Sequence, residues 1–429
     1  MFFNYKHHTK LMVNIFQKKD NIYLVIIEYV LAFFVLIDCN SVYANLINSP
    51  YNLQKMSLVL SLVLIGLVLW QEKVSWRKIL KFSIFPSGIL FIYAVILSCF
   101  IKIPEDLYGS YIKYFVLFLP ISILLFRLYR QKGEEYTLFY RMSDIVLVLS
   151  LVSLIFWSIG PIFNIIQPNK VIQSSWGTMK EINSYWGIQF LRSGQMEKIG
   201  FLNISIYRNI GLYPETPMFN IALLLALCTE LYLKGNAKKW RIGILLITII
   251  STFGTIAVII AMVALFLKII GKLKTFGKWK WTVIFIICGL FAIIVVLLYN
   301  KKLYTAGSYN THLDDFVACL KAWKTSPLFG TGFEINSVIY EFMADFRKSN
   351  LGYTTSAGAV LAHGGIALFL IYIFPFMRLL KFESGKMNEA LFGLIMLSVF
   401  ISFVFPYRFL MFWLLAFGFS TMENSGLGI

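Results

Sequence analysis

The segment Tyr207–Asn220, which reads YRNIGLYPETPMFN, carries Arg208 and Glu215 next to a long apolar run. A charged side chain at the edge of a bilayer costs free energy unless it is solvated, paired or used in chemistry. A guanidinium group can bind phosphate through two parallel hydrogen bonds, and a carboxylate can accept a proton from a hydroxyl group. The segment therefore indicates chemistry on a phosphorylated substrate at a membrane surface. The alternative is a solvated helix start with Pro217 in its first turn.

Further candidate residues lie in two long segments between apolar runs, at about 164–214 and 300–355. Loops of this length in a compact protein are usually functional or disordered, and their aromatic content argues against disorder. Arginine forks suit phosphates and aromatic faces suit sugar rings. The alternative is that the basic residues only solvate the loops. The histidines and cysteines form no metal-binding pattern, so no metal is expected. The candidates are Trp186, Arg192, Tyr213, His312, Lys324, Tyr353 and Thr355.

The composition places these residues in a membrane protein. Of 429 residues, 59% are hydrophobic and only 14% are charged, whereas about a quarter of the residues in a soluble domain are charged. We expect an all-α polytopic membrane protein whose residues 1–429 form one integral membrane domain. The net charge of +18 fits basic cytoplasmic loops better than a nucleic-acid partner, since lysine and arginine gather on the cytoplasmic side of membrane proteins.

About 12 apolar runs approach the length of roughly 20 residues that a spanning helix needs. The distribution of basic residues places both termini in the cytoplasm and the two long segments outside. The basic first stretch and the apolar run after it are interpreted as a retained helix and not a cleaved signal peptide. The expected spans are roughly 21–38, 56–70, 83–101, 109–129, 143–163, 215–233, 241–252, 254–271, 280–299, 356–378, 388–404 and 406–420.

Two details of this topology depend on local pattern. A single helix over Arg241–Gly271 would be about 46 Å long, too long for one upright span, so the sequence STFGT at Ser251–Thr255 predicts a break and two short spans or a re-entrant hairpin. The outer loops are expected to carry short amphipathic helices. In the second loop, helical spacing predicts one that lies on or near the membrane, with an apolar stripe of Leu313, Phe316, Val317, Leu320 and Trp323.

The segment RNIGLYPETPMF resembles the Arg–x–x–Gly–x–x–x–Glu–Pro/Ser stretch of bacterial O-antigen and capsular polysaccharide polymerases of the Wzy type, in the O-antigen ligase-like superfamily. Three further stretches are similar to that family in the same order, over roughly residues 205–370. They are STFGTIAVII, SYNTHLDDFVACLKAWKTSPLFGTGFE and GYTTSAGAVLAHGGIALFLIY.

The chain also departs from the family pattern. Thr216 stands where the family has proline or serine, and His312 lies near the place of a basic arginine. Thr355 and Ser356 stand where the related ligases carry His–Asn, which favours a polymerase over a ligase. His363, beside two glycines, is interpreted as a helix-packing residue.

The resemblance implies a glycosyltransferase of the GT-C-like type that uses no nucleotide sugar and no cofactor. It would join undecaprenyl-pyrophosphate-linked oligosaccharide repeat units into O-antigen or capsule at the outer face of the bacterial cytoplasmic membrane. Its partners would be these lipids, the bilayer and, as a further candidate, a chain-length regulator protein. The alternatives are an O-antigen ligase and a flippase or transporter for lipid-linked oligosaccharides.

The same resemblance suggests roles for the candidates. Arg208 would hold the donor pyrophosphate, with Arg192 second, and Glu215 would take the proton or orient Arg208 as an ion pair. His312 is the alternative base or phosphate contact. The remaining candidates bind substrate: Tyr213 and Trp186 line the sugar path, Tyr353 and Thr355 close the cavity, and Lys324 adds a positive charge.

Overall fold

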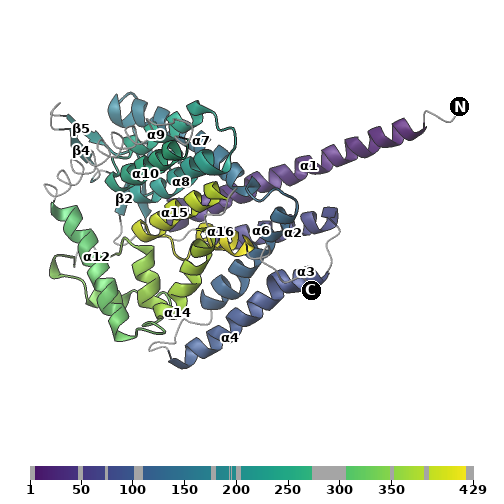
Figure 1. Ribbon diagram of the computed structural model, residues 1–429. Helices are drawn as coiled ribbons and strands as arrows, with labels where there is room; N and C mark the ends of the chain where they lie inside the picture. Colours follow the sequence, from purple (N-terminus) through teal and green to yellow (C-terminus); the bar gives the residue numbers. More distant parts are fainter. Residues whose placement is uncertain are drawn as a thin grey trace, which may run out of the picture.

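The computed structural model is mostly helical (Figure 1). The expected span at 280–299 lies outside the residues that it describes, as do parts of both long loops. The described residues are 5–46, 52–72, 76–100, 110–174, 180–192, 194, 196–199, 204–272, 306–347, 352–380 and 386–421.

The helical elements follow the expected spans closely. Among the described residues, six segments are long and apolar enough to cross a membrane: Leu53–Glu72, Arg77–Ile96, Ile112–Gln131, Thr137–Ile162, Thr216–Leu233 and Ser356–Leu379. They support an α-helical membrane protein, while the expected total of about 12 spans stays a prediction. The α-helices are α1 (Tyr5–Asp38), α2 (Leu53–Glu72), α3 (Trp76–Ile79), α4 (Phe85–Phe100), α6 (Leu119–Gln131), α7 (Thr137–Trp157), α8 (Thr216–Cys228), α9 (Lys239–Ser251), α10 (Thr255–Lys272), α12 (Ala306–Thr325), α13 (Ser337–Glu341), α14 (Ser356–Leu379), α15 (Met387–Ser402) and α16 (Phe409–Ser420).

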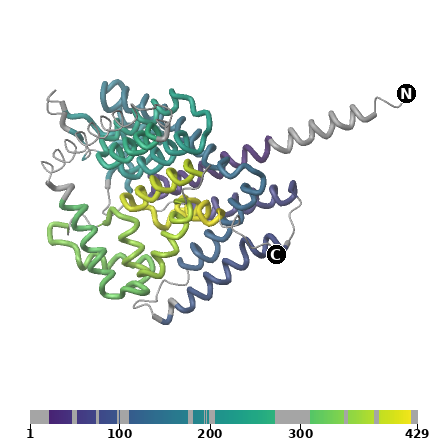
Figure 2. Tube along the Cα trace, viewed as in Figure 1, coloured from purple at the N-terminus to yellow at the C-terminus, as the bar shows by residue number. Residues whose placement is uncertain are grey.

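Short π-helical and 3-10-helical segments adjoin several of these helices. The π-helical segments are η2 (Leu80–Ile84), η3 (Ile112–Phe118), η4 (Ser158–Ile162) and η5 (Thr229–Leu233), and the 3-10 segments are η1 (Tyr43–Asn45) and η8 (Asp345–Arg347). Figure 2 shows the last two helices, α15 and α16, in the middle of the molecule. Most of α16 is buried, and α16 packs against α6, α14 and α1. Its 12 residues measure about 18 Å, so α16 is too short to cross a bilayer alone.

The first long loop corrects the expectation of short amphipathic helices. Its described part forms five short strands: β1 (Lys170–Ser174), β2 (Lys180–Tyr185), β3 (Gln189–Leu191), β4 (Met196–Ile199) and β5 (Ile204–Tyr207). They form an antiparallel sheet in the order β1-β2-β3 and a separate β4-β5 hairpin. Trp186 and Gly187 turn the chain between β2 and β3 with φ of +50° and +75°, backbone angles that tight antiparallel turns use.

The predicted break within Arg241–Gly271 is confirmed. Helix α9 ends at Ser251 and α10 begins at Thr255, with Phe253 between them at φ +52°. The 13 residues of α9 measure about 20 Å, less than the roughly 30 Å of a hydrocarbon core. Two short elements therefore replace one long helix, as the sequence STFGT indicates.

A helix, α12, lies in the second loop where helical spacing predicts one, and its position at the membrane stays a prediction. Its small residues Ala318, Cys319 and Ala322 are buried in the cluster that packs α12 on α14. Part of its apolar stripe faces away from the protein, since Leu313 and Phe316 are about half exposed, at 50% and 49%. Figure 1 shows α12 beside α14 at one edge of the molecule.

Candidate functional site

The segment Tyr207–Asn220 is held in place by a buried polar network with the break between α9 and α10. The side chain of Asn209 donates to Ser251 Oγ at 3.0 Å, and its backbone N–H donates to the Ser251 carbonyl at 3.0 Å. Asn220, on α8, donates to Thr252 Oγ1 at 3.1 Å. Two of the stretches that resemble the polymerases thus contact each other, and their asparagine, serine and threonine residues serve the fold.

The two charged residues of this segment point to other partners. Arg208 forms an ion pair with Glu197 of β4 at 2.7 Å. Glu215, just before α8, forms an ion pair with Arg192. The predicted alternative in which Glu215 orients Arg208 is therefore wrong, because the fold gives each residue a different partner of opposite charge. Arg192 and Glu215 remain partly exposed, at 24% and 19%.

The two aromatic candidates of the first loop lie in different environments. Tyr213 is 1% exposed, stacks on Phe219 and donates to the Leu36 carbonyl at 3.3 Å. It is a core residue, and burial contradicts its predicted place along an open sugar path. Trp186 is 56% exposed at the β2–β3 turn, with its ring edge-on to Phe156.

The second loop contains a buried charge cluster beside the start of α14. Asp315 is wholly buried, forms an ion pair with Arg347 and accepts a hydrogen bond from Thr354 Oγ1 at 2.8 Å. Burial raises the pKa of Asp315, and the bonds from Arg347 and Thr354 partly offset that effect. His312 Nδ1 lies 2.7 Å from the same Thr354 hydroxyl. The cluster therefore fixes the residue next to Tyr353.

The remaining second-loop candidates have simpler roles. Thr355 is the N-cap of α14: its hydroxyl accepts from Gly358 N and donates to the Ile401 carbonyl at 2.7 Å. Lys324 is exposed near the end of α12.

A break in α14 brings another part of the second loop into the helical bundle. Gly365 has φ +63° and ψ −163°, which interrupts the helix. The segment Pro327–Gly332 occupies the break: the carbonyls of Pro327 and Leu328 accept from the N–H groups of Ile366 and Ala367 at 2.9 and 3.1 Å. A Cβ atom on Gly365 would overlap the Leu328 carbonyl, so this approach requires glycine. Irregular backbone at membrane depth is tolerated where protein encloses it or it lines a cavity.

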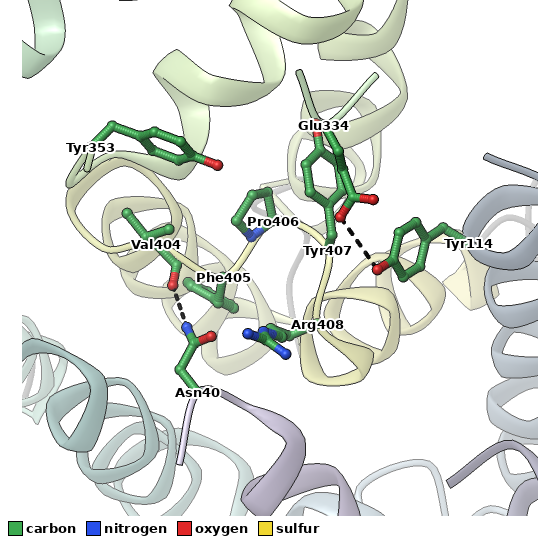
Figure 3. A pocket seen from close by; sticks show the side chains of 9 residues that line it. All are labelled: Asn40, Tyr114, Glu334, Tyr353, Val404, Phe405, Pro406, Tyr407 and Arg408. Carbon is green, nitrogen blue, oxygen red and sulfur yellow. Dashed lines mark hydrogen bonds between the residues drawn. The ribbon is translucent and has the colours of Figure 1, made fainter. Parts of the chain in front are cut away.

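The inserted segment places Glu334 in a cavity of about 190 Å³. Figure 3 shows Tyr114 and Glu334 at one side of this cavity, Tyr353 at the other, and Arg408 near Asn40. Tyr114 donates to Glu334 Oε1 at 3.3 Å. The full lining is Asn40, Tyr114, Glu334, Tyr353, Val404, Phe405, Pro406, Tyr407 and Arg408.

Arg408 lies between α15 and α16, and the end of α1 holds it. Its guanidinium donates to Asn45 Oδ1 at 3.3 Å and lies 3.9 Å from the buried carboxylate of Asp38. The other Asp38 oxygen accepts from the Phe409 N–H at 3.0 Å. Arg408 keeps 23% exposure, so one cation, positioned by an acid and an amide, faces the cavity.

The loop after α1 connects this cavity with the strand-bearing loop. Asn40 donates to the Val404 carbonyl at 2.6 Å on the cavity side. On the other side, the Val42 N–H donates to Leu212 O at 2.9 Å and the Tyr43 hydroxyl donates to Gly187 O at 2.5 Å. The loop after α1 therefore contacts both this cavity and the strand-bearing loop, although only Tyr353 of the predicted site residues lines the cavity.

Sequence reasoning missed most of this site. Arg408, Glu334 and Asn40 are not among the candidate residues that the sequence indicates. The available signals were an arginine between two spans, in FPYRF, and an acid directly after a glycine-rich turn, in FGTGFE.

The chain matches no family model, no curated protein and no solved structure. The chemistry of the site is therefore argued from its own residues. A guanidinium can bind and neutralise phosphate oxygens, a carboxylate can accept a proton from a hydroxyl group, and aromatic walls suit a sugar ring.

Proposed function

We propose that this chain is a membrane-embedded glycosyltransferase that joins lipid-linked oligosaccharide repeat units into a longer polysaccharide. The supporting observation is that Arg408 and Glu334 line one tyrosine-walled cavity. Tyr353 and Tyr114, in that wall, lie at the start of two segments apolar enough to cross a membrane. A cation and a carboxylate in a cavity beside the starts of two such segments suit a substrate that is a lipid, a pyrophosphate and a sugar in one molecule.

The reaction requires the bond between the anomeric carbon and the phosphate oxygen of the donor to break. A hydroxyl oxygen of the acceptor repeat unit bonds to that carbon, and the lipid pyrophosphate leaves with the electron pair. Negative charge grows on the leaving phosphate, which a preorganised cation stabilises, and we assign this role to Arg408. The acceptor proton passes to Glu334, the carboxylate in the same cavity.

The size of the cavity supports this division of the substrate. Its volume of about 190 Å³ is below the roughly 300–1,000 Å³ of pockets that enclose a whole small ligand. It suits the reacting sugar–phosphate junction, while the lipid tail lies in the bilayer and the glycan extends over the strand-bearing loop. Arg192, Arg208 and Trp186, all partly or largely exposed on that loop, are then contacts for the glycan.

We place this reaction at the outer face of the bacterial cytoplasmic membrane, with both termini in the cytoplasm. There the energy comes from the undecaprenyl-pyrophosphate linkage, without a nucleotide sugar or a cofactor. O-antigen and capsule are both compatible products, and a chain-length regulator protein is a compatible partner.

The test is deletion of the gene in its host, followed by analysis of lipid-linked and surface glycans. Loss of a polymerase leaves single repeat units that still reach the outer face. Single repeat units trapped inside the cell would indicate a flippase, and long glycan retained on the lipid carrier would indicate a ligase. Either of these outcomes contradicts the proposal.

A further inference from the structure

His363 lies at the break in α14 and contacts a wall of the cavity. It is 0% exposed, and its Nδ1 atom is 2.9 Å from the hydroxyl oxygen of Tyr407. Among the described residues, its other ring nitrogen, Nε2, has no hydrogen-bond partner. Tyr407 lines the cavity with Glu334 and Arg408, so His363 contacts one residue of the cavity wall through this hydrogen bond.

The ring of Tyr407 is fixed from two sides. The His363 ring stacks against it with centroids 5.8 Å apart and an interplanar angle of 24°. The Tyr114 ring stacks against it at 5.7 Å and 21°. A catalytic group acts best when packing and hydrogen bonds hold it in the reactive geometry, and Tyr407 has both kinds of support.

Hydrogen-bond accounting assigns the direction of the His363–Tyr407 bond. A neutral imidazole carries one N–H group, on either nitrogen. If Tyr407 donated to Nδ1, the hydrogen would sit on Nε2 and leave a buried donor without a partner. If Nδ1 carries the hydrogen, Nε2 is only an unpaired acceptor, and buried orphan acceptors are less rare than buried orphan donors. In this second arrangement the Tyr407 oxygen accepts from His363, and its own proton remains for a ligand.

We propose that Tyr407 is a catalytic hydrogen-bond donor and that His363 is its positioning residue. The Tyr407 hydroxyl donates to the pyrophosphate oxygen that leaves, and Arg408, in the lining of the same cavity, supplies the positive charge. This inference rests on the proposed glycosyl transfer and adds no proton transfer to it, because the Tyr407 proton stays on its oxygen. Phenols have a pKa of about 10 and are protonated at neutral pH, so Tyr407 stabilises growing charge as a neutral donor.

The first test compares two tyrosine-to-phenylalanine variants during chain elongation in liposomes. The substrate is lipid-linked repeat unit extracted from the deletion strain. Tyr407→Phe keeps the stacked ring and removes the donor, so kcat falls about 10²-fold while KM changes little, because the bond strengthens only as the phosphate leaves. The matched control is Tyr111→Phe. Tyr111 is wholly buried outside the cavity lining, its hydroxyl has no described partner, and its loss leaves kcat unchanged.

The second test asks whether His363 acts through Tyr407. His363→Leu lowers kcat about as much as Tyr407→Phe, and the double variant is no slower than Tyr407→Phe alone, since linked residues are non-additive. His363→Asn retains a short side-chain N–H donor and restores much of the rate only when Tyr407 is present. If His363→Leu does not reach the membrane, His363→Asn is compared in the presence of Tyr407 and in the Tyr407→Phe variant. A difference in rate between these two then shows that His363 acts through Tyr407.

The outcomes separate this inference from the proposed function. A kcat of Tyr407→Phe equal to that of the wild type, or an additive loss of kcat in the double variant, overturns the role of Tyr407 and His363. The proposed polymerase still stands in that case if the wild-type protein elongates the repeat units. Failure of the wild-type protein to elongate the extracted repeat units overturns both.

Discussion

The buried amide of Asn209 links the stretches that resemble polymerases, and its removal has a calculable consequence. Its Oδ1 atom accepts from Ser153 Oγ at 2.6 Å, from Gln189 Nε2 at 3.1 Å and from the Gly211 N–H at 3.2 Å. In Asn209→Ala, Gln189 keeps its bond to the Phe190 carbonyl. The Ser153 hydroxyl and the Gly211 N–H lose the partner that the structure gives them.

Each buried donor left without a partner costs about 1–3 kcal/mol, so the two together cost about 2–6 kcal/mol. At about 2–4 °C per kcal/mol for a large domain, the apparent Tm falls by on the order of 10 °C. The assay is thermal unfolding of the purified protein in detergent. Gln131→Ala, which removes an exposed amide at the end of α6, is the matched control and melts with the wild type. If Asn209→Ala also melts with the wild type, the network does not stabilise this end of the bundle.

Two further predictions concern topology and the second-loop cluster. In a variant without native cysteines, Val171→Cys should react with an impermeant thiol reagent in intact cells, and Glu134→Cys should not. The two positions flank the 26-residue apolar segment Thr137–Ile162, so labelling of both would contradict a span there. Arg347→Met should lower the free energy of unfolding by about 3–5 kcal/mol, because it leaves the Asp315 carboxylate buried without its cation. Thermal unfolding of this variant at the wild-type temperature would show that the ion pair does not stabilise the cluster.

The sequence predicted the elements that have strong local signals. Apolar runs located the helices now described from Leu53 to Ser420, and STFGT located the break between α9 and α10. The amphipathic spacing in the second loop located α12, whereas the face that packs on the protein is built from small residues that this spacing does not single out. Small residues such as Ala318 and Ala322 contact the protein, while larger apolar residues such as Leu313 face outward.

The sequence could not predict features that depend on long-range contacts. The strands β1 to β5 contain three to six residues each, too few for alternation to be distinctive. Glu334 reaches the cavity only because the preceding backbone enters the break in α14, and Arg408 is positioned by Asp38, from the first helix. Neither contact leaves a spacing that can be recognised along the chain.

Elongation by purified protein in liposomes, with lipid-linked repeat units from the deletion strain as the only glycan, tests whether this chain is a polymerase. We expect a ladder of chain lengths for the wild type. For Arg408→Lys, which keeps the charge and loses the planar fork that binds phosphate, we expect a rate about 10²–10³-fold lower. If Arg408→Lys forms the same ladder at the wild-type rate, the cavity has no part in the mechanism. If the wild-type protein leaves the repeat units unjoined, the proposed polymerase is contradicted.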